Sequence, residues 1–134
     1  MVGLVVVAHG GLPDQLLETT KMIIGEPLPS TAFVSITGIE KPDVIRTQIE
    51  EAIASADTGD GVLVFTDMFG GTPSNIALSF LKEDSVEVIS GVNLPMLVEM
   101  VYARKQSKLA DLCRQLSDIG RGSIRIASEY LHNE

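Results

Sequence analysis

The sequence predicts an α/β domain built on a doubly wound parallel sheet. Apolar runs of strand length alternate along the chain with segments of helical period, and the connections between them are short. The first apolar run is continuous rather than alternating, which is typical of a strand covered on both faces. Repeated β-α units with short connections favour parallel strands with helices on both sides of the sheet. The commonest small sheet of this kind has the strand order 2-1-3-4, and we expect that order here.

The first half of the chain contains two predicted strands, each followed by a predicted helix. Residues 2–8 are apolar and rich in valine, so they form the expected central strand. The helix over residues 13–24 keeps its apolar side chains on one face and stops at Gly25. Residues 31–36 form the second strand, and Pro42 opens the second helix.

The second half repeats the pattern with less regular spacing. Strands are expected at residues 61–66 and 86–90, with a helix over residues 73–81 between them. Two more helices follow, over residues 94–102 and 109–119.

The last predicted element is a C-terminal edge strand. Residues 123–127 alternate polar and apolar side chains, and Gly120 and Gly122 precede them. A chain of 134 residues suits one domain with a single core and is too short for two, so residues 1–134 are expected to be one domain.

Composition excludes several classes of function. The 10 lysines and arginines and 18 aspartates and glutamates give a formal net charge of -8, which repels nucleic acid and anionic membranes and favours a basic partner. Cys113, the single cysteine, excludes an internal disulfide, and with two histidines it is too little for a four-ligand zinc site. No metal or cofactor is expected. Residues 2–8 are far shorter than the roughly 20 residues of a membrane span and follow no basic segment, so a cytoplasmic protein is expected.

Two predicted strand ends carry the residues of greatest chemical interest. His9 follows the first strand and Asp67 follows the third, and these strands are neighbours at the topological switch point of the expected sheet. A carboxylate that accepts a hydrogen bond from imidazole Nδ1–H leaves Nε2 with a free lone pair. His9 and Asp67 are therefore the candidate catalytic pair.

The segment after Asp67 has the composition of an anion site. Gly70 and Gly71 allow the backbone to approach a ligand closely, and Thr72 is expected to be the N-cap of a helix with Pro73 at its first position. Backbone N–H groups of Gly71 and Thr72, with the Thr72 hydroxyl, would bind a phosphoryl group beside His9.

Each of these features alone has an ordinary structural explanation. A histidine at a strand end, an aspartate in a turn and a Gly-Gly-Thr-Pro helix start are all common, and only their meeting at one switch point favours a functional site. Asn93 either caps the next helix or reaches the site, with capping favoured. Met68 and Phe69 are either locally buried or a docking surface for a protein partner, with docking favoured, and His132 is expected to be exposed near the terminus.

Three motifs together resemble a known family. They are Val-Val-Val-Ala-His-Gly at residues 5–10, Thr-Asp-Met-Phe-Gly-Gly-Thr-Pro-Ser-Asn at residues 66–75 and Gly-Val-Asn-Leu-Pro-Met-Leu-Val-Glu at residues 91–99. The chain is similar over nearly its whole length to the IIA component of the mannose-type family of the bacterial phosphoenolpyruvate-dependent sugar phosphotransferase system.

The resemblance implies a phosphohistidine relay for sugar uptake or its regulation. In that family the histidine after the first strand takes a phosphoryl group from HPr and passes it to a IIB component, and His9 occupies that position. The resemblance further implies that Asp67 orients His9, that Gly71 and Thr72 bind the phosphoryl group, and that the protein is a homodimer exchanging residues 123–127. Many relatives continue into a IIB domain, whereas this sequence ends at Glu134, so its IIB partner is expected to be a separate polypeptide.

Three alternatives stay open at this stage. The phosphotransfer subunit of a dihydroxyacetone kinase has a similar first domain, although the Gly-Gly-Thr-Pro loop favours the mannose-type family. A tetrapyrrole metal chelatase also begins with a strand followed by His-Gly, but typically uses a second inward histidine, for which His132 is poorly placed. An FMN-binding module would need a phosphate loop after the first strand and more aromatic side chains than this sequence has.

Overall fold

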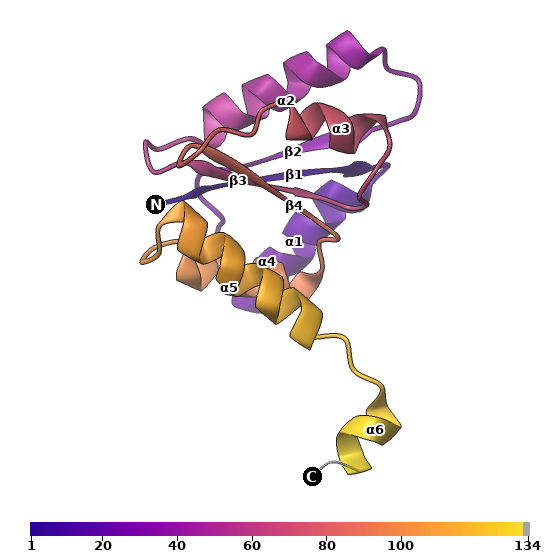
Figure 1. Ribbon diagram of the computed structural model, residues 1–134, viewed down its shortest axis with the longest axis vertical. Helices are drawn as coiled ribbons and strands as arrows, with labels where there is room; N and C mark the ends of the chain where they lie inside the picture. Colours follow the sequence, from indigo (N-terminus) through magenta and orange to yellow (C-terminus); the bar gives the residue numbers. More distant parts are fainter. Residues whose placement is uncertain (133–134) are drawn as a thin grey trace.

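The computed structural model describes residues 1–132 and has three layers, with one sheet between two layers of helices (Figure 1). Helices α2 and α3 cover one face of the sheet, while α1, α4 and α5 cover the other. The elements in chain order are β1 (Gly3–His9), α1 (Leu12–Ile24), β2 (Thr31–Ile36), α2 (Pro42–Ala56), β3 (Val62–Thr66), α3 (Thr72–Leu78), β4 (Val86–Ser90), α4 (Leu94–Ala103), α5 (Leu109–Gly122) and α6 (Ala127–His132).

The sheet has the predicted strand order β2-β1-β3-β4, and all of its strand pairs are parallel. In the register of β1 and β2, His9 lies opposite Ile36, and in that of β1 and β3, Val7 lies opposite Thr66. Strands β1 and β2 therefore end level, β3 ends two residues earlier, and the loops that follow all three meet at one edge of the sheet.

The side chains of β1 explain why its sequence is apolar without alternation. Leu4 and Val6 belong to the core formed with α1, α4 and α5, whereas Val5 and Val7 belong to the core formed with α2 and α3. All four are at most 1% exposed. A strand with both faces covered gains from an apolar side chain at every position, so the central strand was recognisable from sequence.

The expected edge strand at residues 123–127 does not form in this chain. After α5 the backbone leaves the body, residues 124–126 have no regular structure, and Ala127 begins the short helix α6 (Figure 1). A strand needs a neighbouring strand for its backbone hydrogen bonds, and this segment has none within residues 1–132. The alternating pattern predicted a strand, but the described chain has no further strand for residues 123–127 to pair with.

The glycines expected before that strand belong to α5 instead. Gly120 lies inside the helix, where an added Cβ would collide with the side chain of Met96 on α4. Gly120 therefore allows close packing of α4 on α5. Helix α3 also differs from its prediction, because it ends at Leu78 and the chain continues through tighter turns, with hydrogen bonds such as Ser79 N–H to the Ile76 carbonyl. Among the described residues no helix is both long and apolar enough to span a bilayer.

Candidate functional site

His9 and Asp67 meet at the carboxyl edge of the sheet, as the strand order predicts. Although they are 58 positions apart, the Asp67 carboxylate accepts hydrogen bonds from the His9 backbone N–H at 2.9 Å and from the His9 ring nitrogen Nδ1 at 2.8 Å, both through Oδ2. A carboxylate oxygen accepts and does not donate, so this contact fixes the proton on Nδ1. Nε2 then carries the lone pair.

The two side chains differ in their access to solvent. The Asp67 side chain is 14% exposed, whereas that of His9 is 56% exposed. The carboxylate is therefore held within the protein while the imidazole projects from it. Gly10, with φ +59°, turns the chain immediately after His9 and leads into α1.

Opposing effects set the charge of Asp67. Partial burial raises the pKa of Asp67, but hydrogen bonds from the His9 backbone and ring and from the Met68 N–H to Oδ1 outweigh burial and bring the pKa below its usual value. The carboxylate is thus charged at neutral pH and can stabilise positive charge on the imidazole of His9.

The glycine loop after Asp67 has the backbone that its sequence suggests, with one correction. Gly70 and Gly71 have φ values of +87° and +83°, a region that favours glycine. The N-cap of α3 is Gly71 rather than Thr72, and Thr72 is the first helical residue with Pro73 after it. The turn needs the conformation that only glycine adopts readily, so the cap falls one residue earlier. Gly71 and Thr72 are both exposed.

A cleft of about 400 Å³ lies between His9 and the loops that follow β2 and β3. The β3 side supplies Gly71, Thr72 and Pro73, and the β2 side supplies Gly38 and Glu40 among others. The His9 imidazole, which is 56% exposed, is therefore open to a group that approaches through this cleft. Within residues 1–132, no three histidine, cysteine, aspartate or glutamate side chains are grouped to hold a metal ion.

Glu40 is a site residue that the sequence analysis missed. Its carboxylate accepts hydrogen bonds from the backbone N–H groups of Thr37, Gly38 and Ile39 and from the Thr37 hydroxyl. These bonds, chiefly the one from the Thr37 backbone, lower the pKa of Glu40 to about 2. The signal available was a glutamate two residues after a glycine that follows a strand end, but such spacing does not by itself predict that a carboxylate folds back on its own loop.

Thr66 is a second missed residue, directly before Asp67. Its side chain is buried, and its hydroxyl donates to Ser90 Oγ at 2.8 Å. The Thr66 carbonyl accepts hydrogen bonds from the backbone N–H groups of Gly91 and Val92. Thr66 therefore ties the end of β3 to the loop after β4 and supports the position of Asp67.

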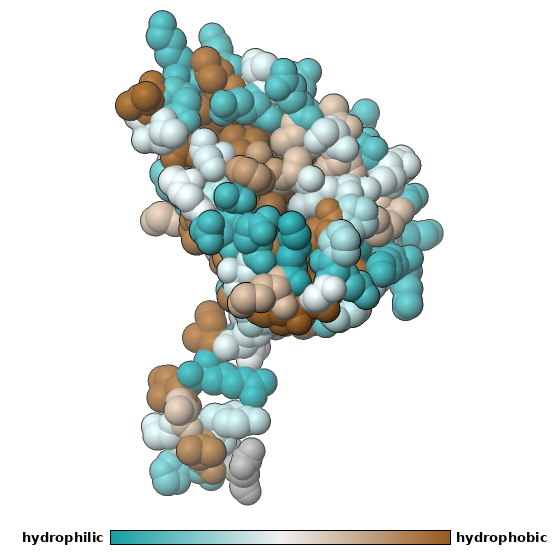
Figure 2. Space-filling model, turned by 180° about the vertical axis from the view of Figure 1, so that it is seen from behind, coloured by the Kyte–Doolittle hydropathy of each residue, from teal (hydrophilic) through white to brown (hydrophobic). Residues whose placement is uncertain are grey.

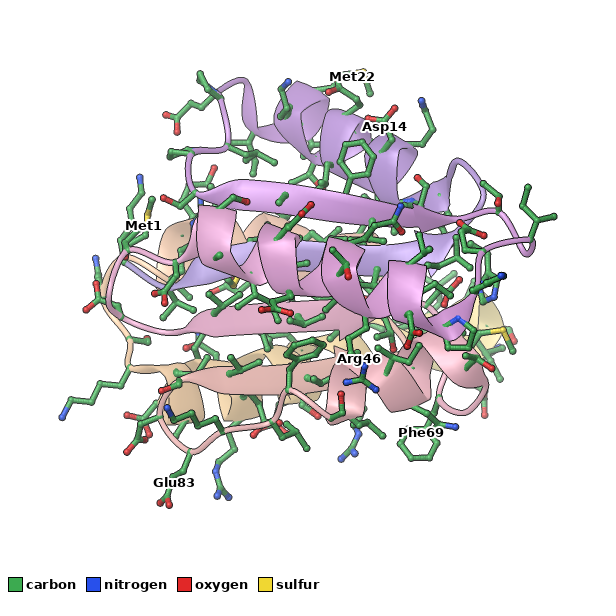
Figure 3. All side chains as sticks on the ribbon, turned by 90° about the horizontal axis from the view of Figure 1, so that it is seen from above. Met1, Asp14, Met22, Arg46, Phe69 and Glu83 are labelled. Atoms are coloured by element: carbon green, nitrogen blue, oxygen red, sulfur yellow. The ribbon has the colours of Figure 1, made fainter. Side chains whose placement is uncertain are left out.

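The remaining predicted site residues separate into different places. Asn93 caps α4 by accepting from the Met96 N–H at 3.2 Å, and its amide donates to the Gly120 carbonyl, so its role is structural. Met68 and Phe69 are 66% and 78% exposed, and Figure 3 shows the Phe69 ring projecting from the ribbon. His132 is exposed on α6, in the segment that leaves the body.

A family model described as "PTS system fructose IIA component" matches residues 3–117 of this chain. The chain belongs to this family, EIIA-man. The matched residues include both strand ends that carry His9 and Asp67. The resemblance to the mannose-type IIA components of the phosphotransferase system (PTS) is thereby confirmed.

Curated relatives of this EIIA-man chain carry PTS names. It is 34% identical to a PTS fructose-specific EIIA component of Bacillus subtilis, an alignment that covers 98% of this chain and 90% of that protein. It is 35% identical over 92% of its length to the PTS mannose-specific EIIAB component of Escherichia coli K12, but spans only 39% of that longer protein.

Solved structures of EIIA components share the fold. A PTS component EIIA from Streptococcus agalactiae aligns with a TM-score of 0.84 at 28% identity, covering 96% of this chain and 99% of that one. A PTS IIA protein associated with a fucose utilization operon of Streptococcus pneumoniae also gives 0.84, at 26% identity, with coverage of 98% and 99%. The EIIA-man family is a family of phosphotransferase components, which gives this chain a role in phosphoryl transfer.

Proposed function

We propose that His9 accepts a phosphoryl group from phospho-HPr and passes it to a IIB component, with residues 1–134 acting as one IIA domain. The contact from His9 Nδ1 to Asp67 Oδ2, 2.8 Å long, carries this proposal, because it directs Nε2 away from the carboxylate on a ring that is 56% exposed. Sugar uptake or its regulation would be the purpose of the relay.

The proposed reaction is an in-line exchange between two histidines. The Nε2 lone pair attacks phosphorus, the nitrogen–phosphorus bond of phospho-HPr breaks, and the electron pair of that bond returns to the donor imidazole. His9 keeps its proton on Nδ1 and becomes an imidazolium-like phosphoramidate. The Asp67 carboxylate stabilises that positive charge through the same hydrogen bond, so no proton has to leave the site.

The glycine loop is the proposed binding site for the phosphoryl oxygens. Gly71 lines the cleft and Gly70 precedes it, so the backbone there carries no side chain, and the N–H groups of Gly71 and Thr72 and the Thr72 hydroxyl are the proposed donors. Fixed N–H dipoles stabilise charge on the transferred group without the reorganisation that water requires. Helix α3 has only seven residues, so the local N–H groups matter more than its macrodipole.

We also propose that the protein is a homodimer assembled through its C-terminal segment. Ile124, Ile126 and Leu131 are 79%, 65% and 66% exposed, and Figure 2 shows hydrophobic side chains on a segment standing apart from the body. Strand β4 is at the edge of the sheet and offers backbone groups to a further strand. A second chain would supply the neighbour that residues 123–127 lack here.

The test is intact-mass analysis after incubation with phosphoenolpyruvate, enzyme I and HPr. Wild type and a His132→Ala variant are expected to gain one acid-labile phosphoryl group, and His9→Ala is expected to gain none while keeping the circular dichroism of the wild type. His132→Ala is the matched control, because it removes the other histidine of the sequence. Phosphorylation of folded His9→Ala would contradict the proposal.

A further inference from the structure

We propose that the loop of residues 37–41, called the Ile39 loop below, is the second half of the docking surface for the phosphoryl-donor protein. Ile39 is the contact residue and Glu40 is the positioning residue that holds it. The inference rests on the proposed function, in that it assumes a protein donor to His9. It adds a specific contact on the β2 side of the site.

The strand order places His9 between two loops. Strand β1 lies between β2 and β3, so the Ile39 loop after β2 and the loop of residues 68–71 after β3 flank the histidine on opposite sides. Gly38 and Glu40 of the first loop and Gly71 of the second line the cleft beside His9. A donor that brings a phosphoryl group to Nε2 has to approach between them, so both loops are available for contact.

Ile39 is presented to solvent by a loop with many internal hydrogen bonds. It is 89% exposed, the largest value among the exposed large hydrophobic side chains within residues 1–132. The Glu40 carboxylate accepts from three consecutive backbone N–H groups, at residues 37, 38 and 39, and from the Thr37 hydroxyl. A rigid loop loses little conformational entropy when a partner covers its apolar tip.

The loop on the other side of His9 presents apolar side chains in the same way. Met68 and Phe69 are 66% and 78% exposed, and the Met68 backbone N–H is fixed by Asp67 Oδ1 at 2.9 Å. Leu12, which begins α1 three residues after His9, is 44% exposed. Exposed apolar side chains therefore follow each of the three strand ends around the histidine, which is the pattern of an interaction site rather than of isolated exposed residues.

Charge around the site selects the kind of partner. Residues 9–14, 36–43 and 67–73 contain four carboxylates, Asp14, Glu40, Asp43 and Asp67, and one lysine, Lys41. The lowered pKa of Glu40 keeps that side chain charged throughout the physiological range. The fitting occupant is a donor protein with an apolar patch beside its phosphohistidine and basic side chains around the patch.

The experiment measures initial rates of phosphoryl transfer from phospho-HPr to wild type, Ile39→Ala and Met22→Ala. Met22 is the matched control, because it is 77% exposed on the last turns of α1, about 15 Å along the helix from Leu12. Ile39→Ala is expected to raise the KM for phospho-HPr about fivefold or more with kcat unchanged, as a lost contact residue does. Met22→Ala is expected to match the wild type. Glu40→Gln should also raise the KM for phospho-HPr, although Ile39 is unchanged, because Glu40 holds the loop that presents Ile39.

The outcomes separate the docking proposal from the proposed function. A wild type that accepts no phosphoryl group from active phospho-HPr overturns the relay itself. A phosphorylated wild type with the same KM as folded Ile39→Ala overturns only the docking role of the Ile39 loop. Slower transfer from the phosphorylated variant to a IIB component, with an unchanged KM for phospho-HPr, would also overturn it and assign the loop to the acceptor.

Discussion

The carboxyl edge of the sheet and the C-terminal segment differ in how they are held: the edge by hydrogen bonds between distant parts of the chain, the C-terminal segment by hydrogen bonds to its near neighbours in sequence. At the edge, His9 and Asp67 are held by hydrogen bonds between segments 58 positions apart. Beyond Gly122, the hydrogen bonds within the described residues are local, such as the one from the Arg125 side chain to the Gly122 carbonyl at 3.2 Å, and the same side chain lies over the Tyr130 ring. One chain therefore brings His9 and Asp67 together, while the segment after α5 makes no hydrogen bond to the sheet within residues 1–132.

This difference predicts that changes at the edge act on transfer and changes beyond α5 act on assembly. The largest effect is expected from Asp67→Asn, which keeps the size of the side chain but removes its charge. The rate of His9 phosphorylation should fall about a hundredfold, because the amide neither fixes the Nδ1 proton as well nor stabilises the imidazolium-like product. Single-turnover mass analysis at neutral pH measures that rate.

The pH dependence checks whether charge is the cause. The pKa of folded Asp67 is below the usual value of 3.8, so the stabilisation it provides is fully present above that value and is lost as pH falls through the folded pKa. Denaturant unfolding should show the gap in stability between wild type and Asp67→Asn at neutral pH and its loss in acid. A gap that widens as pH falls would contradict the assignment.

A smaller effect is expected from Gly71→Ala. With φ +83° and ψ 164°, Gly71 lies in a region that is essentially restricted to glycine, and an added Cβ meets no atom within 4 Å. Backbone strain alone should shift the loop and slow transfer about tenfold, for a strain of roughly 1 to 3 kcal/mol. Gly25→Ala, at the positive-φ C-cap of α1, is the control and should leave the rate unchanged. Equal rates for the two variants would argue against the loop as a phosphoryl site.

Thr66→Val tests the support beneath Asp67 and should slow transfer only about threefold. The substitution keeps the shape of the side chain and removes the hydroxyl that donates to Ser90, a loss of about 1 kcal/mol. Thr20→Val removes a comparable buried hydroxyl from α1, where it donates to the Leu16 carbonyl at 2.7 Å. Both variants should lose stability, and only Thr66→Val should lose rate. A rate loss in both would indicate a general effect of stability.

The smallest effect on transfer is expected from a chain that ends at Gly122. The deletion removes α6 and its exposed side chains but none of the contacts to His9 or Asp67, so the rate of His9 phosphorylation should stay within about twofold of the wild type, near the 0.5 kcal/mol typical of changes away from a site. Light scattering should show a dimer for the wild type and a monomer for the shortened chain. A large loss of rate in the monomer would show that the two regions are not independent.

Sequence reasoning succeeded where a local pattern and the sheet topology agreed. The continuous apolar run of β1 identified the central strand, and the expected parallel order placed His9 beside Asp67. Sequence reasoning missed Glu40 and Thr66. Nothing in the residues next to Glu40 indicates that its carboxylate accepts hydrogen bonds from three backbone N–H groups. Nothing next to Thr66 indicates that its hydroxyl donates to Ser90 on the neighbouring strand. Sequence reasoning also predicted a strand at residues 123–127, which does not form. The alternation of polar and apolar side chains can be read from the segment itself, whereas a strand also needs a neighbouring strand to pair with.

The most direct test of the account is to identify the phosphorylated nitrogen of His9. Protein labelled with ¹⁵N-histidine, phosphorylated through HPr, would be measured by ¹⁵N and ³¹P NMR, with His9→Ala used to assign the signals. The account predicts phosphorus bonded to Nε2 and a proton retained on Nδ1, because Asp67 Oδ2 occupies the Nδ1 side at 2.8 Å. Phosphorus bonded to Nδ1 would contradict it, since that product requires the histidine to leave Asp67.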